Sequence, residues 1–159
     1  MLTTEILILY LALFFICLLL SAFFSSAETA FVGLQRIRVE HLVATEVRGA
    51  ARVARLIKRP ERLLSTILLG NNFVNTAAAA LATAIAVSIW GSQGILYATI
   101  VVTVLLLVFG ESTPKTIATH HTERLTLALA RPIEVISWVL TPFVVVLSWI
   151  ASKFSRLAG

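Results

Sequence analysis

Residues 63–118 decide the fold: LLSTILLGNNFVNTAAAALATAIAVSIW (63–90), GSQG (91–94) and ILYATIVVTVLLLVFGESTPKTIA (95–118). Each apolar run is long enough to cross a bilayer, which takes roughly 20 helical residues. Lipid cannot satisfy exposed backbone polar groups, so both runs must be helical or buried. The short, uncharged turn between them predicts a hairpin of two transmembrane helices, over about 63–90 and 94–118.

The composition of the whole chain agrees with a membrane protein. Of its 159 residues 58% are hydrophobic and 13% are charged, and the mean hydropathy is +0.95. Soluble domains are usually about 45–50% apolar, so the excess here has to face lipid. We therefore expect one all-α membrane domain over residues 1–159, in a cell membrane and most simply the inner membrane of a bacterium.

Two further apolar stretches flank this hairpin. Residues 4–33 predict a first span, because the N-terminus lacks the basic segment of a cleaved signal peptide. The last stretch, about 133–150, contains Pro142 and is followed by Lys153 and Arg156. We favour a juxtamembrane helical region over 120–157, either a helix or a helical hairpin, that lies along the inner interface. A fourth span is the alternative.

Basic residues set the expected orientation. Eight of the thirteen lysines and arginines lie between the first two spans: Arg36, Arg38, Arg48, Arg52, Arg55, Lys58, Arg59 and Arg62. Cytoplasmic loops carry such an excess, so the N-terminus is expected outside and the C-terminus inside. The connection 36–62 interleaves apolar and basic residues, which predicts an amphipathic helix on the membrane surface, broken near Gly49. A basic loop that only fixes topology is the alternative. The net charge of +5 then serves lipid headgroups and not nucleic acid.

A serine cluster interrupts the first span near its inner end. Ser21, Ser25 and Glu28 are spaced by four and three residues, so they share one helix face. Serines in membrane helices often serve only close packing, and that alternative stays open here.

A second polar cluster lies early in the second span. Asn71, Asn72 and Asn75 fall within five residues of an apolar helix. Asn75 shares a face with each of the other two. Amide oxygens suit a cation without adding charge, although asparagines also form hydrogen bonds between membrane helices.

The third cluster is the strongest indication of function. Glu111 is an ionisable residue within an apolar span, and such residues usually mark functional sites. Pro114 removes the backbone donor that would normally reach the Gly110 carbonyl. Broken helices of this kind form ion sites in membrane proteins. The alternative is a Glu111–Lys115 pair beside an ordinary proline kink.

These clusters predict one binding site for a hard cation. At about 1.5 Å per residue, all three lie at similar depth in the inner half of the bilayer. The candidate ligands supply only oxygen, which suits Mg²⁺ or Ca²⁺ and not zinc or copper. They are Ser21, Ser25, Asn72, Asn75, Gly110 and Glu111. No nucleophile–base pair or phosphate-binding loop is present, so we do not expect an enzyme.

The same clusters resemble the transmembrane domain of the CorC/cyclin M family of magnesium transporters. The matching motifs are Ser21 with Phe24-Ser25-Ser26-Ala27-Glu28-Thr29-Ala30, Pro60-Glu61-Arg62-Leu63-Leu64, Leu69-Gly70-Asn71-Asn72-Phe73-Val74-Asn75, and Gly110-Glu111-Ser112-Thr113-Pro114-Lys115. They cover nearly the whole chain in order. Ser26 and Ser112 depart from the usual family residues, at positions where no essential ligand is expected.

This resemblance implies three spans with a cytoplasmic-side juxtamembrane helix, a homodimer, and export of Mg²⁺ driven by entry of Na⁺. Family members continue into CBS domains, which are absent from these 159 residues. Two other functions remain open: a divalent cation channel with the same ligands, and a membrane anchor or sensor whose polar clusters only hold helices together.

Overall fold

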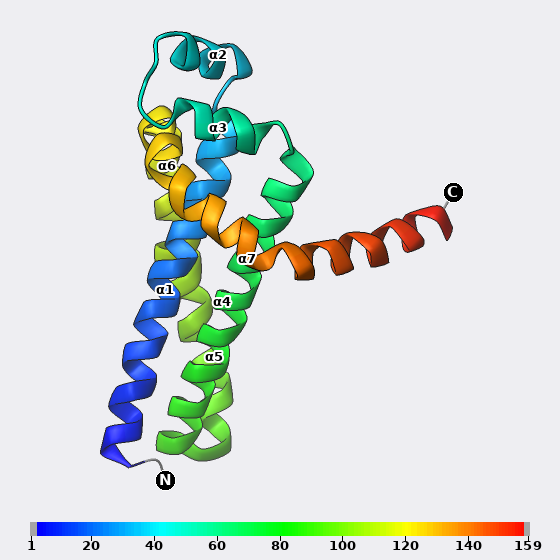
Figure 1. Ribbon diagram of the computed structural model, residues 1–159. Coiled ribbons are helices and arrows are strands. Elements are labelled where there is room, and N and C mark those ends of the chain that lie inside the picture. The colour runs from blue at the N-terminus through cyan, green and yellow to red at the C-terminus, as the bar shows by residue number, and fades with distance from the viewer. Residues whose placement is uncertain (1–2, 158–159) are drawn as a thin grey trace.

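The chain is built from helices that form one elongated bundle with a helical layer at one end (Figure 1). The computed structural model describes the backbone of residues 3–157 and the side chains of residues 3–146, 149 and 153. The elements in chain order are α1 (Thr4–Gly33), α2 (Arg36–Ala44), α3 (Ala50–Ile57), α4 (Pro60–Trp90), the 3-10 turn η1 (Gly91–Gln93), α5 (Gly94–Leu105), the π-helical segment η2 (Leu106–Ser112), α6 (Thr113–His120) and α7 (Thr122–Leu157).

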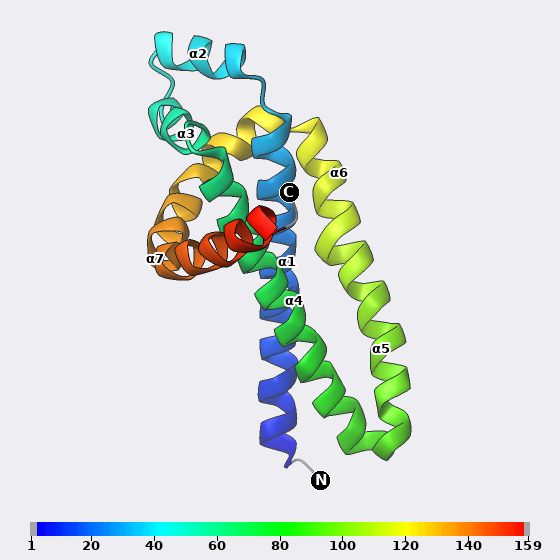
Figure 2. The ribbon, with the colours of Figure 1, turned by 90° about the vertical axis from the view of Figure 1, so that its right-hand side faces the viewer.

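The predicted hairpin forms the centre of the bundle. Helix α4 runs down the molecule, turns at η1, and α5 returns beside it toward α6 (Figures 1 and 2). Helix α4 begins three residues earlier than expected, because Pro60 occupies its first turn, where a missing N–H costs nothing. The return leg continues without interruption through η2 into α6. The three expected spans are therefore present as helices, and α1 coincides with the expected 4–33.

Three stretches of the described chain are apolar and long enough to cross a membrane: Thr4–Gly33, Pro60–His120 and Thr122–Val146. The second bends back on itself at η1, so it supplies two antiparallel legs. Much of the surface of α1 consists of exposed apolar side chains, among them Ile8, Phe15 and Leu19. Exposed apolar area of this extent indicates lipid contact.

Two apolar clusters hold the helices together. One is centred on Phe24, Phe31, Ile67 and Ile133, and joins α1, α4 and α7. The other, toward the η1 end, consists of Phe14, Ala78 and Val102 with partly buried neighbours. Between them, Gly70 lets α1 and α4 approach closely, because a Cβ there would lie 2.4 Å from the Phe24 ring.

The basic connection 36–62 contains two short helices instead of one. Helices α2 and α3 are separated at residues 45–49, and Gly49 has a φ of +94°, which other residues rarely adopt. The expected break at Gly49 is therefore confirmed. Val39, Leu42, Ala50 and Val53 are buried, so each short helix has one apolar face against the protein.

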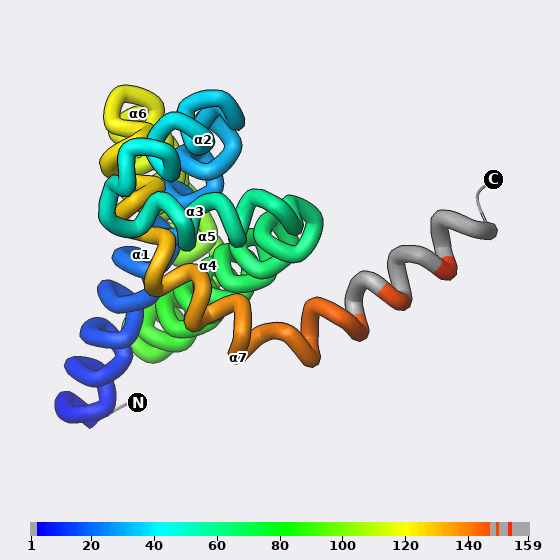
Figure 3. The backbone as a smooth tube through the Cα atoms, turned by 45° about the horizontal axis from the view of Figure 1, so that its top comes forward, coloured from blue at the N-terminus to red at the C-terminus, as the bar shows by residue number. Residues whose placement is uncertain are grey.

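The last apolar stretch forms a single helix, α7, not a helical hairpin. It passes sideways across the bundle, next to α3 and the beginning of α4 (Figures 1 and 3). Ion pairs attach it to the basic connection: Glu134 accepts from Arg52 and Arg55, and Glu123 from Arg38. A buried hydrogen bond from Thr126 Oγ1 to the Ala30 carbonyl, 3.0 Å long, joins α7 to α1.

Candidate metal centre

The serine cluster lies at the contact between α1, α4 and η2. Ser21 and Ser25 are both fully buried, one helical turn apart on the same face of α1. Full burial of two hydroxyl groups needs compensating partners. The partners of these two hydroxyl groups therefore show whether the serines only allow close helix packing or form part of a polar site.

The Ser21 hydroxyl faces two oxygen acceptors. Its Oγ lies 3.5 Å from Asn71 Oδ1 on α4 and 3.5 Å from the Gly110 carbonyl oxygen on η2. A hydroxyl has only one proton, so it can donate to one of these oxygens at a time. Both distances are long for an O–H···O bond, whose usual length is about 2.7–2.8 Å. Three helices thus bring oxygen atoms together without linking them by strong hydrogen bonds.

Gly110 is what allows this approach. A Cβ at position 110 would lie 2.7 Å from Ser21 Oγ and 3.3 Å from Ser21 Cβ. At such distances the Ser21 side chain or the backbone of η2 would have to shift. The glycine therefore lets the backbone carbonyl of η2 reach the serine face of α1.

The backbone around Gly110 is π-helical, not broken as the sequence predicted. Segment η2 spans Leu106–Ser112, and the Thr113 N–H donates to the Val108 carbonyl, five residues earlier. Pro114 supplies no N–H for the Gly110 carbonyl, and the wider π turn absorbs this defect while the helix continues. Single π turns of this kind are frequent at functional sites.

Two buried oxygens near this contact have no hydrogen-bond partner among the described residues. They are Ser25 Oγ and Asn75 Oδ1. The other end of the Asn75 amide is engaged, because Nδ2 lies 3.4 Å from Glu111 Oε1. Leaving a buried polar group unpaired costs about 1–3 kcal/mol. Two such unpaired oxygens, one of them on the amide that faces the Glu111 carboxylate, are consistent with a ligand that the polypeptide itself does not supply.

The Glu111–Lys115 pair, which was the simpler explanation for this motif, is not formed. Lys115 Nζ instead lies 3.2 Å from Glu28 Oε2 on α1. Ser26 Oγ donates to the Pro114 carbonyl over 3.4 Å. These contacts fix α6 against the C-terminal part of α1 and leave the Glu111 carboxylate to Asn75.

One predicted ligand is not brought to the cluster. Asn72 is exposed, and Asn71 is the asparagine that contacts Ser21. Adjacent helical residues point about 100° apart, so only one of them can face α1. The sequence showed that Asn75 can share a helix face with either Asn71, four residues away, or Asn72, three residues away. It did not show which of the two faces points toward α1. The other five candidates, Ser21, Ser25, Asn75, Gly110 and Glu111, lie in or beside the cluster.

The chemistry of the cluster is that of an oxygen site with a single charge. Its donor atoms are two hydroxyls, two amide oxygens, one backbone carbonyl and one carboxylate. Among the described residues, no group of three or more His, Cys, Asp or Glu side chains converges. The oxygen donors alone are of the kind that hard cations such as Mg²⁺ or Ca²⁺ prefer.

Comparison with known proteins gives a consistent assignment. Residues 12–159 match the family described as cyclin M transmembrane N-terminal domain. The UPF0053 inner membrane protein YfjD of Escherichia coli is 36% identical over 140 residues, which cover 88% of this chain and 33% of that protein. A UPF0053 protein of Haemophilus influenzae is 36% identical over 141 residues, covering 89% of this chain and 33% of the relative.

A chloroplastic DUF21 domain-containing protein of Arabidopsis thaliana is also 36% identical, over 141 residues that cover 88% of this chain and 21% of the relative. The chain thus spans about a third or less of the length of these curated relatives. Its apolar helices and these relatives make it a multi-pass membrane protein. The expected resemblance is confirmed over nearly the whole sequence, and the chain belongs to the cyclin M transmembrane domain family.

Proposed function

We propose that this chain is the membrane part of a magnesium transporter, which exports Mg²⁺ in exchange for Na⁺. The observation that carries the proposal is the oxygen cluster between α1, α4 and η2. Its buried Ser25 Oγ and Asn75 Oδ1 lack partners in the described part of the chain, and its one carboxylate is Glu111. The family resemblance supplies the identity of the ion, the coupling ion and the direction.

Helix packing alone accounts poorly for this cluster. Hydrogen bonds between membrane helices contribute only about 0.6 kcal/mol each on average, and here the contacts are 3.4–3.5 Å long. Two unpaired buried oxygens would cost more than such contacts return. A bound cation reverses this balance, because each of these oxygens, the serine hydroxyls included, can then offer it a lone pair.

A single carboxylate also suits transport better than permanent storage. One negative charge neutralises half of a divalent ion, and the remaining ligands are neutral. Affinity is then expected to be moderate, so the ion can be released. Because Mg²⁺ prefers six oxygens at about 2.0–2.1 Å, closure of α1 and η2 around it would bring the oxygens nearer than they lie now.

The proposed orientation follows from the basic residues. The end that carries α2, α3 and the start of α4 faces the cytoplasm under the positive-inside rule, and the N-terminus, at the opposite end in Figure 1, faces outward. In that orientation α7 lies along the inner membrane surface, and the oxygen cluster lies in the cytoplasmic half of the membrane. A homodimer is part of the proposal and rests on the family resemblance.

A flux assay tests the proposal against its alternatives. The purified chain is reconstituted in liposomes that contain a magnesium-sensitive dye, with equal Mg²⁺ on both sides and a Na⁺ gradient across the membrane. A coupled transporter moves Mg²⁺ uphill, against the direction of Na⁺ flow. A channel gives Mg²⁺ flux only down a Mg²⁺ gradient, and an anchor gives none.

Glu111→Gln is the matched control, because it preserves shape and removes the charge. Uphill flux that disappears in this variant, while the protein stays folded in the same liposomes, supports the proposal. Flux that does not respond to Na⁺ would contradict the coupling. Absence of flux in the parent together with absence of magnesium binding would contradict the transport function.

A further inference from the structure

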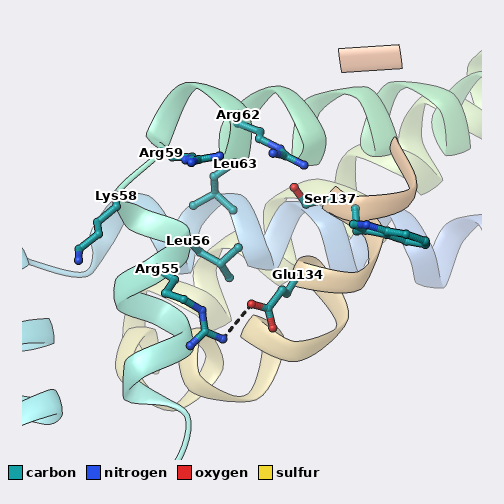
Figure 4. Close-up of a pocket in the computed structure, with 9 residues that line it drawn as sticks. Arg55, Leu56, Lys58, Arg59, Arg62, Leu63, Glu134 and Ser137 are labelled. Atoms are coloured by element: carbon teal, nitrogen blue, oxygen red, sulfur yellow. Dashed lines mark hydrogen bonds and ion pairs between the residues drawn. The ribbon is translucent and has the colours of Figure 1, made fainter. Parts of the chain in front are cut away.

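A second polar site lies at the basic end of the molecule, apart from the oxygen cluster. It is an open cavity of about 410 Å³ between α3, the beginning of α4 and α7 (Figure 4). Its lining residues are Arg55, Leu56, Lys58, Arg59, Arg62, Leu63, Glu134, Ser137 and Trp138. Four of these side chains are cationic and one is anionic.

The single carboxylate in this cavity is already neutralised. Glu134 accepts from Arg55 Nη2 over 3.0 Å and from Arg52 Nε over 2.7 Å. Arg52 does not line the cavity. Glu134 therefore offers no charge to compensate the remaining lysine and arginines, and the cavity keeps a positive excess.

Two arginines in the cavity retain unused donors. Within the described part of the chain, the Arg62 guanidinium donates from Nη2 to Thr141 Oγ1, whereas its Nε is buried and has no partner. No ion pair or side-chain hydrogen bond engages Arg59 among these residues. Figure 4 shows Arg59, just before α4, beside Arg62 in the first turn of α4, on the side of the cavity opposite Arg55 and Glu134. Arginine donors in a fork arrangement match the oxygens of a phosphate group.

The surroundings of the cavity indicate which phosphate it meets. Arg59 and Arg62 come directly before the apolar part of α4, so they lie where a span meets the membrane surface. Trp138 lines the cavity and is 78% exposed, and tryptophan is enriched at the level of lipid headgroups. Along the same helix, Val135, Val139 and Phe143 are exposed at helical spacing, which gives α7 an apolar outer face.

We propose that this cavity binds the phosphate group of an anionic phospholipid headgroup. The arginines of α3 and α4 hold the phosphate oxygens, the Ser137 hydroxyl lies at the floor, and the acyl chains follow the apolar face of α7. Basic pockets next to membrane helices on the cytoplasmic side bind such headgroups. A lipid held here would add a link between α3, α4 and α7, which are also joined by ion pairs, apolar contacts and hydrogen bonds between α4 and α7.

Native mass spectrometry of the purified chain provides the test. The protein is exchanged into detergent with equal amounts of phosphatidylglycerol and phosphatidylcholine, and retained lipids are counted. We expect one phosphatidylglycerol per chain to be retained over phosphatidylcholine, and Arg59→Gln to weaken its retention about tenfold, the effect of losing one charge-assisted contact. Arg59 is exposed, so its replacement should leave folding intact.

The control is Arg48→Gln, which removes the same charge from an exposed residue outside the cavity. Retention that falls equally in both variants, or in neither, would overturn the proposal. A second arm adds excess inorganic phosphate. Binding of free phosphate without selective retention of phosphatidylglycerol would overturn the lipid assignment. Glu111→Gln should retain lipid like the parent, so failure of this proposal is distinguishable from failure of the transport function.

Discussion

The two halves of the bundle contain the same three helical legs but different contacts. Near η1, α1, α4 and α5 meet through Phe14, Ala78 and Val102, an entirely apolar cluster. About two turns further along α1, the legs meet through Ser21, Asn71 and Gly110. Packing suffices to hold the first contact together, and the helices remain continuous through both.

This difference shows what polar residues contribute to the second half. If oxygen atoms were needed to hold these helices together, the half near η1 would need them too. The polar half instead contains two unpaired buried oxygens and a π turn, both of which are costly. Such features persist where function requires them. The predictions below separate the two halves by their effect on magnesium affinity, from the largest to the smallest.

The largest effect is expected from Glu111→Gln. The substitution removes the one charge of the oxygen cluster and keeps its volume. Loss of a residue that only supports a metal ligand costs about 10–100-fold in affinity, so loss of the charged ligand should cost more than about 100-fold. Isothermal calorimetry with Mg²⁺ measures this, and an unchanged affinity would rule Glu111 out as ligand or counter-charge.

Ser25→Ala should weaken magnesium binding about tenfold and yet stabilise the metal-free protein. The Ser25 hydroxyl is buried without a partner among the described residues, and removing such a group relieves about 1–3 kcal/mol. Calorimetry and thermal unfolding, each with and without Mg²⁺, measure the two effects. If the substitution instead destabilises the metal-free protein and leaves the affinity for Mg²⁺ unchanged, Ser25 is a packing residue.

The asparagines offer a matched pair of variants. Asn71→Ala removes the amide that faces Ser21, whereas Asn72→Ala removes an exposed one. We expect a several-fold loss of magnesium affinity in the first and a smaller change in the second. The reverse order in the same titration would favour the original assignment of Asn72 as a ligand, for example through rearrangement of α4 on binding.

Phe14→Ala should leave magnesium affinity unchanged, although it is the most disruptive change in packing. Phe14 is only 6% exposed, and truncation of a buried phenylalanine costs about 3–5 kcal/mol in well-packed cores. The melting temperature should fall while calorimetry on the folded protein gives the parent affinity. Weaker binding by the folded variant would mean that the two halves are coupled.

A cysteine introduced near the end of α7 should have the smallest effect on magnesium affinity, and it reports the topology of this helix. Lys153→Cys in a Cys17→Ala background places one exposed thiol beyond the apolar part of this helix. An impermeant thiol reagent should label it only from the cytoplasmic side. Labelling from outside intact cells would instead make α7 a fourth span and would reverse the proposed position of the C-terminus.

The sequence predicted the helices well because the membrane constrains them. Length and hydropathy located α1 and both legs of the hairpin, and Gly49 correctly marked the break between α2 and α3. For the last stretch the sequence left a helix and a helical hairpin open, because Pro142 could have ended a helix, and α7 accommodates both Pro132 and Pro142 internally.

The site was predicted less completely than the fold. Residue type and depth selected Ser21, Ser25, Gly110 and Glu111 as candidates, but the rotation of α4, which brings Asn71 and not Asn72 to Ser21, was not visible in the sequence. Neighbouring residues on a helix point about 100° apart, so Asn71 and Asn72 cannot both face α1. A helix that is apolar on most sides has few side chains from which its rotation about its own axis can be predicted. Likewise, Pro114 indicated a disturbed backbone, but the sequence did not show that the disturbance takes the form of a π turn.

The most direct measurement is anomalous diffraction from crystals of the chain grown with Mn²⁺ in place of Mg²⁺. Mn²⁺ takes similar oxygen ligands and has an anomalous signal that Mg²⁺ lacks. The account predicts one strong peak between Ser21, Ser25, Gly110 and Glu111, and its loss in crystals of Glu111→Gln. The account would be contradicted by a peak elsewhere, or by the absence of a peak in this cluster at an Mn²⁺ concentration that stabilises the protein.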